Sequence, residues 1–199
     1  MSSRHRFLAP IILAAASASL ADAQAPAASR VPFGTISPSL ALAGELARSS
    51  SLDPWEPAPG FQLLVRAPFY AGAVELGVQQ LSHDSRRAGI PGFRARYVFV
   101  GWALDATPLP RLTLAPGLRF GIYDMQFDDE SLPDYAESEN EMAAALTAEA
   151  AYLIGGKWSG VAGLDARLVF TEPRMRQLGF TAGLRYTLAS PEWLRDFLD

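Results

Sequence analysis

The stretch QLGFTAGLRYTL, residues 177–188, decides the fold of this chain. Its bulky apolar side chains fall on one residue parity, at Leu178, Phe180, Leu184 and Tyr186. The other parity carries glutamine, threonine and arginine side chains. Successive side chains of a β-strand point to opposite faces of a sheet, so this pattern predicts a strand with one apolar and one polar face.

The same alternation recurs along the chain and predicts eight strands. The connections between the strands alternate between long and short, and an even strand number with alternating loop lengths is typical of outer-membrane barrels. The many alanines of 141–154 leave an amphipathic helix as the alternative for that segment. The predicted strands span residues 36–46, 60–67, 72–82, 93–104, 112–127, 141–154, 158–170 and 177–188.

The apolar parity is expected to face lipid. A soluble barrel with its apolar side chains inside is the alternative. However, an eight-stranded barrel is barely wide enough for its own side chains, and about thirty large apolar residues cannot all fit inside it. A water-exposed surface would also carry more lysine than Lys157, the only lysine in the chain. An aromatic girdle is expected near the strand ends, at Trp158, Tyr152, Phe93, Tyr97, Phe170 and Tyr186.

The polar parity then places charged side chains in the lumen. An isolated buried charge is costly, so opposite charges enclosed there should pair and plug the barrel. A narrow, arginine-lined and anion-selective channel is the alternative. The predicted lumen charge network consists of Glu45, Arg66, Glu75, Arg94, Arg96, Arg119, Glu149, Asp165, Arg167 and Arg185.

The N-terminus has the features of a secretory signal. Arg4 and Arg6 precede a largely apolar run, and an Ala-x-Ala site ends the segment 1–23. An uncleaved anchor helix is the alternative, but the apolar run is shorter than the roughly 20 residues that span a bilayer. Residues 24–35 form a polar lead before the barrel, which spans residues 36–188.

The chain continues beyond the last predicted strand. Residues 189–199 are expected to form a short amphipathic helix, with Ser190 as the N-cap and Pro191 in the first helical position. Such a helix would lie in the headgroup layer or cover the periplasmic mouth of the barrel.

The composition excludes several classes of function. With 17 Lys and Arg against 21 Asp and Glu, the chain has no basic patch for nucleic acid. The absence of cysteine excludes disulfides, thiolate metal sites and cysteine catalysis. No phosphate loop, nucleotide fingerprint or histidine cluster is present, so no cofactor, metal site or catalytic residue is expected.

The last strand resembles the assembly signal of outer-membrane proteins, in which a polar residue and a glycine precede two spaced hydrophobic residues. The matching residues are Thr181, Gly183, Tyr186 and Leu188. The whole chain after the signal resembles the outer membrane protein beta-barrel domain family of small, eight-stranded, antiparallel up-and-down barrels. The resemblance implies a bacterial outer-membrane location, insertion by the barrel assembly machinery and contact with lipid and lipopolysaccharide.

One tripeptide suggests chemistry. His83-Asp84-Ser85 resembles the His-x-Ser motif of lipid A deacylases, which are barrels that cleave an acyl ester. However, His83 and Ser85 share the lumen parity and fall in a predicted outer loop, early in the chain. We therefore interpret the tripeptide as an ordinary polar loop, with a lipid A esterase as the alternative function.

Two further loops carry polar residues. The serines of 49–51 and Trp55 form no specific motif. An acidic segment offers carboxylates that divalent cations prefer, but it lacks calcium-loop spacing and is interpreted as a solvated outer loop. Its acidic residues are Asp128, Asp129, Glu130, Asp134, Glu137, Glu139 and Glu141.

The sequence thus predicts a non-enzymatic barrel that serves envelope structure, adhesion or minor solute passage.

Overall fold

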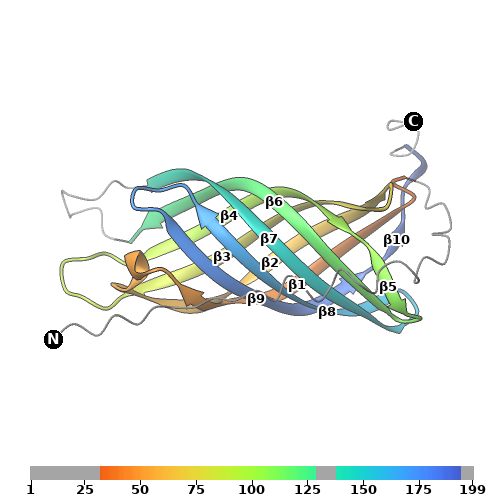
Figure 1. Cartoon of the computed structure of the whole chain (residues 1–199), viewed down its shortest axis with the longest axis horizontal. Coiled ribbons are helices and arrows are strands. Elements are labelled where there is room, and N and C mark those ends of the chain that lie inside the picture. The colour runs from red at the N-terminus through yellow and green to blue at the C-terminus, as the bar shows by residue number, and fades with distance from the viewer. Residues whose placement is uncertain (1–31, 129–137, 194–199) are drawn as a thin grey trace, which may run out of the picture.

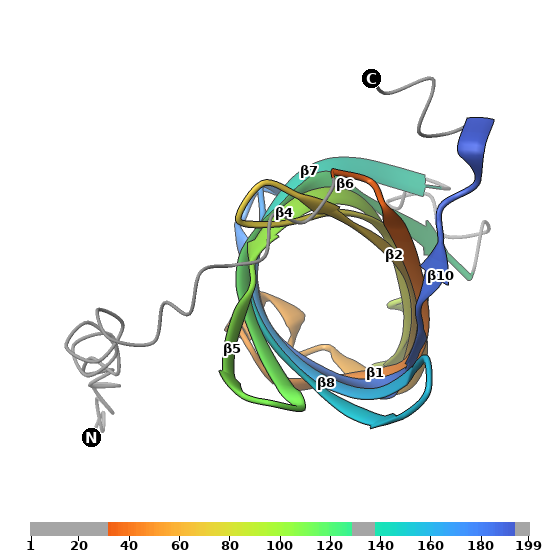
Figure 2. The ribbon, with the colours of Figure 1, turned by 90° about the vertical axis from the view of Figure 1, so that its right-hand side faces the viewer.

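The computed structural model describes residues 32–128 and 138–193. Eight long antiparallel strands close into a barrel, seen from the side in Figure 1 and along its axis in Figure 2. Each strand pairs with its neighbours in the chain, and β9 pairs back with β1 to close the ring. The long strands are β1 (Thr35–Arg48), β2 (Trp55–Phe69), β3 (Gly72–Ser85), β4 (Phe93–Leu104), β6 (Leu112–Phe127), β7 (Ser138–Gly155), β8 (Trp158–Val169) and β9 (Met175–Tyr186).

Two short strands lie at one end of the barrel. The first, β5 (Ala106–Leu109), pairs with β6, and the second, β10 (Leu188–Ala189), pairs with β1. We call this the turn end, because tight connections such as 70–71 and 156–157 lie there. In the second of these turns Gly156 adopts a φ of +57°, a conformation that glycine takes without steric cost. The opposite, loop end carries the longer connections and the short 3-10 helix η1 (Ser50–Leu52).

The eight predicted strands are all present, and the segment 141–154 lies within β7 rather than in a helix. The bounds differ most at the loop end, where β2 begins five residues earlier than predicted, at Trp55. This extension of β2 includes Pro57 and Pro59. They are accommodated because the pairing of β1 with β2 stops at Gly60, and a proline on an unpaired edge sacrifices no ladder hydrogen bond.

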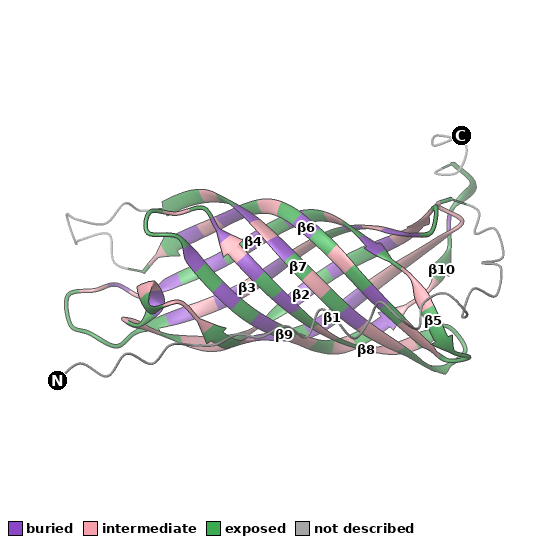
Figure 3. Cartoon of the chain, viewed as in Figure 1, coloured by how far each residue is buried: buried purple, intermediate pink, exposed green. Residues whose placement is uncertain are grey.

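Large apolar side chains cover the outside of the barrel. Buried and exposed residues alternate along each strand, as Figure 3 shows. Leu42 is 70% exposed and Leu146 is 64% exposed, whereas Arg167 and Asp165 are buried. This arrangement confirms the outward orientation of the apolar face and contradicts the soluble alternative. Barrel closure also pairs the backbone groups of each strand, which a lipid environment requires.

Strand β4 is turned the opposite way from the prediction. Phe93 and Tyr97 are 2% and 1% exposed inside the barrel, and Arg94 and Arg96 are exposed on the outside. The parity rule failed here because residues 97–104 are apolar or small on both faces, while the interior near the loop end is itself an apolar core. The predicted lumen position of Arg94 and Arg96 was therefore wrong.

The predicted girdle is correspondingly only in part correct. Trp158, Tyr152 and Phe170 are exposed, and Tyr186 is half-buried with its ring centroid 4.7 Å from that of Trp158. The other two predicted members, on β4, belong to the interior.

Both predicted terminal segments fall largely outside the described residues. The signal 1–23 and most of the lead 24–35 lie there, so the signal stays a prediction. Of the segment 189–199, Ala189 belongs to β10 and the description ends at Trp193, so the C-terminal helix is not shown. Among the described residues, no helix has the length and apolarity needed to cross a bilayer.

Candidate functional site

An apolar cluster packs inside the loop end of the barrel. Leu52 of η1 is 1% exposed and lies in this cluster with Phe93 of β4. Trp55 packs edge-on against Phe93, with a centroid distance of 5.3 Å, and its Nε1 donates to the Pro91 carbonyl over 2.7 Å. The connection after β1 is thus folded into the barrel mouth rather than standing free in solvent.

A buried cation packs against two aromatic rings of this cluster. The Arg167 guanidinium lies 4.5 Å from the centre of the Tyr97 ring and 5.8 Å from that of Tyr123. It pairs with Asp165 over 2.9 Å and donates to the Gln79 amide oxygen. Carboxylate, amide and ring faces together compensate this buried charge for the water that it has lost.

His83 lies in the same interior, at the loop end of β3. Its Nε2 is 3.2 Å from Glu45 Oε2, and its ring stacks on Phe93 at 4.4 Å. The interpretation of this residue as part of an outer loop was wrong, because β3 continues to Ser85. Ser85 Oγ instead donates to the Arg87 carbonyl over 2.8 Å, and His83 Nδ1 has no partner in the described structure.

The middle residue of that tripeptide, Asp84, is exposed. The nucleophile, base and orienting carboxylate of an esterase need successive hydrogen bonds. In the described chain His83 is bonded to a lumen carboxylate and not to Ser85, so the tripeptide is not arranged as a catalytic triad.

A second charged cluster fills the half of the interior nearer the turn end. Arg119 Nε donates to Glu75 over 2.8 Å, and the Arg119 guanidinium lies 4.6 Å from the centre of the Phe99 ring. Arg66 pairs with the same Glu75 at 3.0 Å and with Asp105 at 3.0 Å.

Glu149 of β7 joins two arginines across the barrel. It accepts from Arg185 at 2.7 and 2.8 Å and lies 3.4 Å from Arg66. Together with Glu75, Asp105 and Arg119, these residues make a cluster of three arginines and three carboxylates. Its formal charges balance, and buried ionic groups require such compensation.

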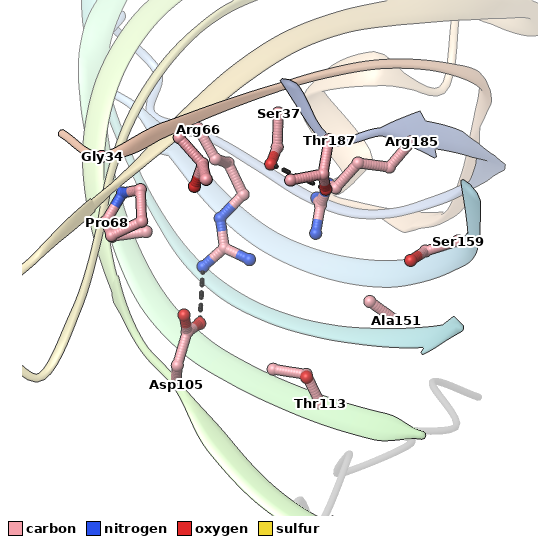
Figure 4. Close-up of a pocket in the computed structure, with 12 residues that line it drawn as sticks. Gly34, Ser37, Arg66, Pro68, Asp105, Thr113, Ala151, Ser159, Arg185 and Thr187 are labelled. Atoms are coloured by element: carbon pink, nitrogen blue, oxygen red, sulfur yellow. Dashed lines mark hydrogen bonds and ion pairs between the residues drawn. The ribbon is translucent and has the colours of Figure 1, made fainter. Parts of the chain in front are cut away.

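Below this cluster, a cavity of about 540 Å³ opens at the turn end, as Figure 4 shows. Arg66, Asp105 and Arg185 form part of its wall, and Ser37 and Thr187 hydrogen-bond to each other over 3.1 Å within it. Deeper in the barrel, beside Arg119 and Asp165, a void of only about 10 Å³ remains, roughly the space of one water molecule. The interior thus narrows from an open polar cup to closely packed side chains.

The structure encloses most of the predicted charge network. Arg94 and Arg96 are the exceptions. The enclosed residues are Glu45, Arg66, Glu75, Arg119, Glu149, Asp165, Arg167 and Arg185. Sequence reasoning missed Asp105, which lies in a predicted connection, although it shares the parity of the inward-facing Gly101 and Ala103. It also missed Tyr97 as a partner of Arg167, because it assigned the apolar parity of β4 to lipid.

The predicted assembly-signal residues lie where the barrel closes. Thr181 and Gly183 pair with β1, and Tyr186 ends β9. Leu188 belongs to β10 and pairs with Ile36.

The acidic segment is only partly described, since residues 129–137 lie outside the description. Among the residues that are described, no three His, Asp or Glu side chains gather as metal ligands.

A closed eight-stranded antiparallel barrel with an apolar outer face and a charged interior defines the small outer-membrane class of β-barrels. Its apolar outer face agrees with the predicted location in a bacterial outer membrane. No protein-family model and no curated protein matches the chain in sequence.

Solved outer-membrane proteins share this fold. Neisserial surface protein A superposes with a TM-score of 0.61 at 15% identity, over 78% of this chain and 98% of its own. Ail, the attachment invasion locus protein of Yersinia pestis, gives a TM-score of 0.55 at 17% identity, over 78% and 99% of the two chains. OprG from Pseudomonas aeruginosa gives 0.55 at 10% identity, over 81% and 99%. At these identities the likeness concerns the fold.

Proposed function

We propose that this protein is a non-enzymatic component of the outer membrane whose lumen does not conduct ions and whose role is structural. The observation that carries the proposal is that contacts between side chains fill the interior from one end of the barrel toward the other. Going from the loop end to the cavity at the turn end, these are the apolar cluster, the contacts of Arg167, and the ionic cluster of three arginines and three carboxylates. An ion crossing the barrel would have to break these buried ion pairs, and no water is at hand to solvate the separated charges.

The alternative of an arginine-lined channel is disfavoured by the same contacts. A selective pore exposes its charged rings to passing ions. Here Arg66, Arg119 and Arg185 are each within 3.0 Å of a carboxylate oxygen and are 5–6% exposed. Their charge is already neutralised, so they offer little field to an anion that enters the cup.

Conductance in planar bilayers tests the proposal. We expect no single-channel steps from the purified, folded protein. Heat-modifiable mobility on electrophoresis of the protein recovered from the same lipid shows that it was inserted and folded. Regular steps from the wild-type protein, altered by Arg119→Gln, would contradict the structural role and favour the channel.

We further propose that the last strand is read by the barrel assembly machinery. The exposed Leu188 and the half-buried Tyr186 lie beside the β1–β9 seam, where the barrel closes last if the strands are added in chain order. Tyr186→Ala with Leu188→Ala should slow folding into vesicles that contain the purified machinery, but not spontaneous folding into detergent. Equal slowing in both assays would assign these residues to stability instead.

A further inference from the structure

The reversed orientation of β4 leaves two cations on the lipid-facing side of the barrel. Arg94 and Arg96 are exposed, and each is followed on the same outer face by Val98, Val100 and Trp102. An arginine on the lipid face is costly near the bilayer midplane and nearly cost-free at the interface. Their place at the loop end of β4 therefore matches the headgroup layer rather than the acyl chains.

The strand register shows that the two arginines belong to a boundary between apolar and polar residues on the outer face of the barrel. Across β3, β4, β6 and β7, one row of paired, outward-facing residues is wholly apolar. It consists of Val78, Val98, Ile122 and Met142. The next row toward the loop end is wholly polar and consists of Gln80, Arg96, Asp124 and Asn140. The row after it is also polar and consists of Ser82, Arg94, Gln126 and Ser138. We call these two polar rows the outer polar patch.

The arginines of the outer polar patch are free to bind an anion. Neither Arg94 nor Arg96 takes part in an ion pair among the described residues. Asp124, the carboxylate across from Arg96, accepts a hydrogen bond from Gln126 over 3.3 Å. The two arginines are two residues apart on one strand face, or about 7 Å along the strand, so both guanidinium groups can reach one headgroup.

We propose that the outer polar patch binds the headgroup of a phosphorylated glycolipid in the outer leaflet. Guanidinium groups form paired hydrogen bonds with phosphate oxygens. The flanking amides and hydroxyls of Gln80, Ser82, Asn140 and Ser138 suit sugar hydroxyls, because they both donate and accept. The adjoining apolar row continues the surface toward acyl chains, and this continuity favours an amphiphile over a free phosphate ion.

This inference rests on the outward apolar face meeting lipid, and not on the state of the lumen. If the barrel conducted ions, the proposed lipid site would be unaffected, and if it did not conduct, the lipid site would still need its own test. The failure of one proposal is therefore distinguishable from the failure of the other.

Titration of the detergent-folded protein, followed by native mass spectrometry, tests the proposal. The probes are diphosphorylated lipid A, the same lipid without phosphates, phosphatidylglycerol and inorganic phosphate. We expect the wild-type protein to bind the diphosphorylated lipid at least about tenfold more tightly than the dephosphorylated one, because charge-assisted hydrogen bonds are lost with the phosphates. Inorganic phosphate at millimolar concentration should not displace the lipid.

Arg94→Gln combined with Arg96→Gln should abolish the preference for phosphate. Arg176→Gln is the matched control, because Arg176 is an exposed arginine at the loop end of β9, outside the outer polar patch. If the wild-type protein bound diphosphorylated and dephosphorylated lipid A with equal affinity, that result alone would overturn the proposal. It would also be overturned if Arg176→Gln had the same effect as the double substitution, if inorganic phosphate competed fully, or if phosphatidylglycerol bound as tightly as lipid A.

Discussion

Glu149→Gln removes one negative charge from the interior while keeping the size of the side chain. In the wild-type protein Glu149 receives two hydrogen bonds from Arg185, at 2.7 and 2.8 Å. Arg66 also contacts Glu149 but keeps Glu75 and Asp105 as partners. The loss therefore falls mainly on Arg185, whose charge stays buried without a carboxylate. Breaking a buried pair in this way costs about 3–5 kcal/mol.

The lower end of that range applies, because the introduced glutamine would still accept one hydrogen bond from Arg185. A loss of about 3 kcal/mol lowers the ratio of folded to unfolded protein by a factor of roughly 100. Urea titration of the protein in lipid vesicles, followed by tryptophan fluorescence, measures it as a shift of the unfolding midpoint. The matched control is Glu139→Gln, an exposed glutamate on the same strand, which should change stability by less than about 0.5 kcal/mol.

A double-mutant cycle separates the ion pair from other effects. Adding Arg185→Gln to Glu149→Gln removes the unpaired charge, so the double variant should be more stable than the sum of the two single losses predicts, by about 1–3 kcal/mol. If Glu149→Gln unfolds like the wild-type protein, or if the two losses simply add, the ionic cluster does not hold the interior together and the reasoning fails.

Three other outcomes are expected. Leu118→Arg, on the outer face beside the enclosed Arg119, should destabilise the inserted barrel by about 2–4 kcal/mol in the same urea titration, and a neutral result would place Leu118 outside the membrane. Gly121→Val should lower the yield of heat-modifiable, folded protein on electrophoresis, because a Cβ there would meet the backbone carbonyl oxygen of Val98 on the neighbouring strand; normal folding would refute this close approach. Chelation of divalent cations should leave the thermal unfolding midpoint unchanged if the acidic segment 128–140 is merely solvated, and a drop would reveal a cation site there.

The sequence predicts the strands well because the period-two pattern and the loop lengths reflect the same geometry. On β6, Leu118, Phe120 and Ile122 are large and face outward, whereas Gly117 and Arg119 face inward. A narrow lumen admits glycine and a few paired charges, so residue size and polarity agree at each of these positions.

On β4 the same rule fails, because size and polarity conflict there. Val98 and Trp102 face lipid, while Tyr97 and Phe99 face the barrel and provide the rings beside two buried arginines. Both parities are apolar from Tyr97 onward, and only the small, inward-facing residues Gly101 and Ala103 carry a signal for the true orientation. Contacts between strands that are distant in the chain, such as Arg167 with Tyr97, cannot be read from the periodicity of one strand.

The most direct measurement compares two neighbouring residues of β7. The chain contains no cysteine, so Tyr152→Cys and Ala151→Cys each introduce a single thiol that can carry a small fluorophore. Tyr152 points outward, and Ala151 lines the cavity of about 540 Å³, which has room for a label. In vesicles of lipid with brominated acyl chains, the label at position 152 should be strongly quenched and the label at 151 hardly at all. Equal quenching at both positions, or stronger quenching at 151, would contradict an apolar outside around a charged interior.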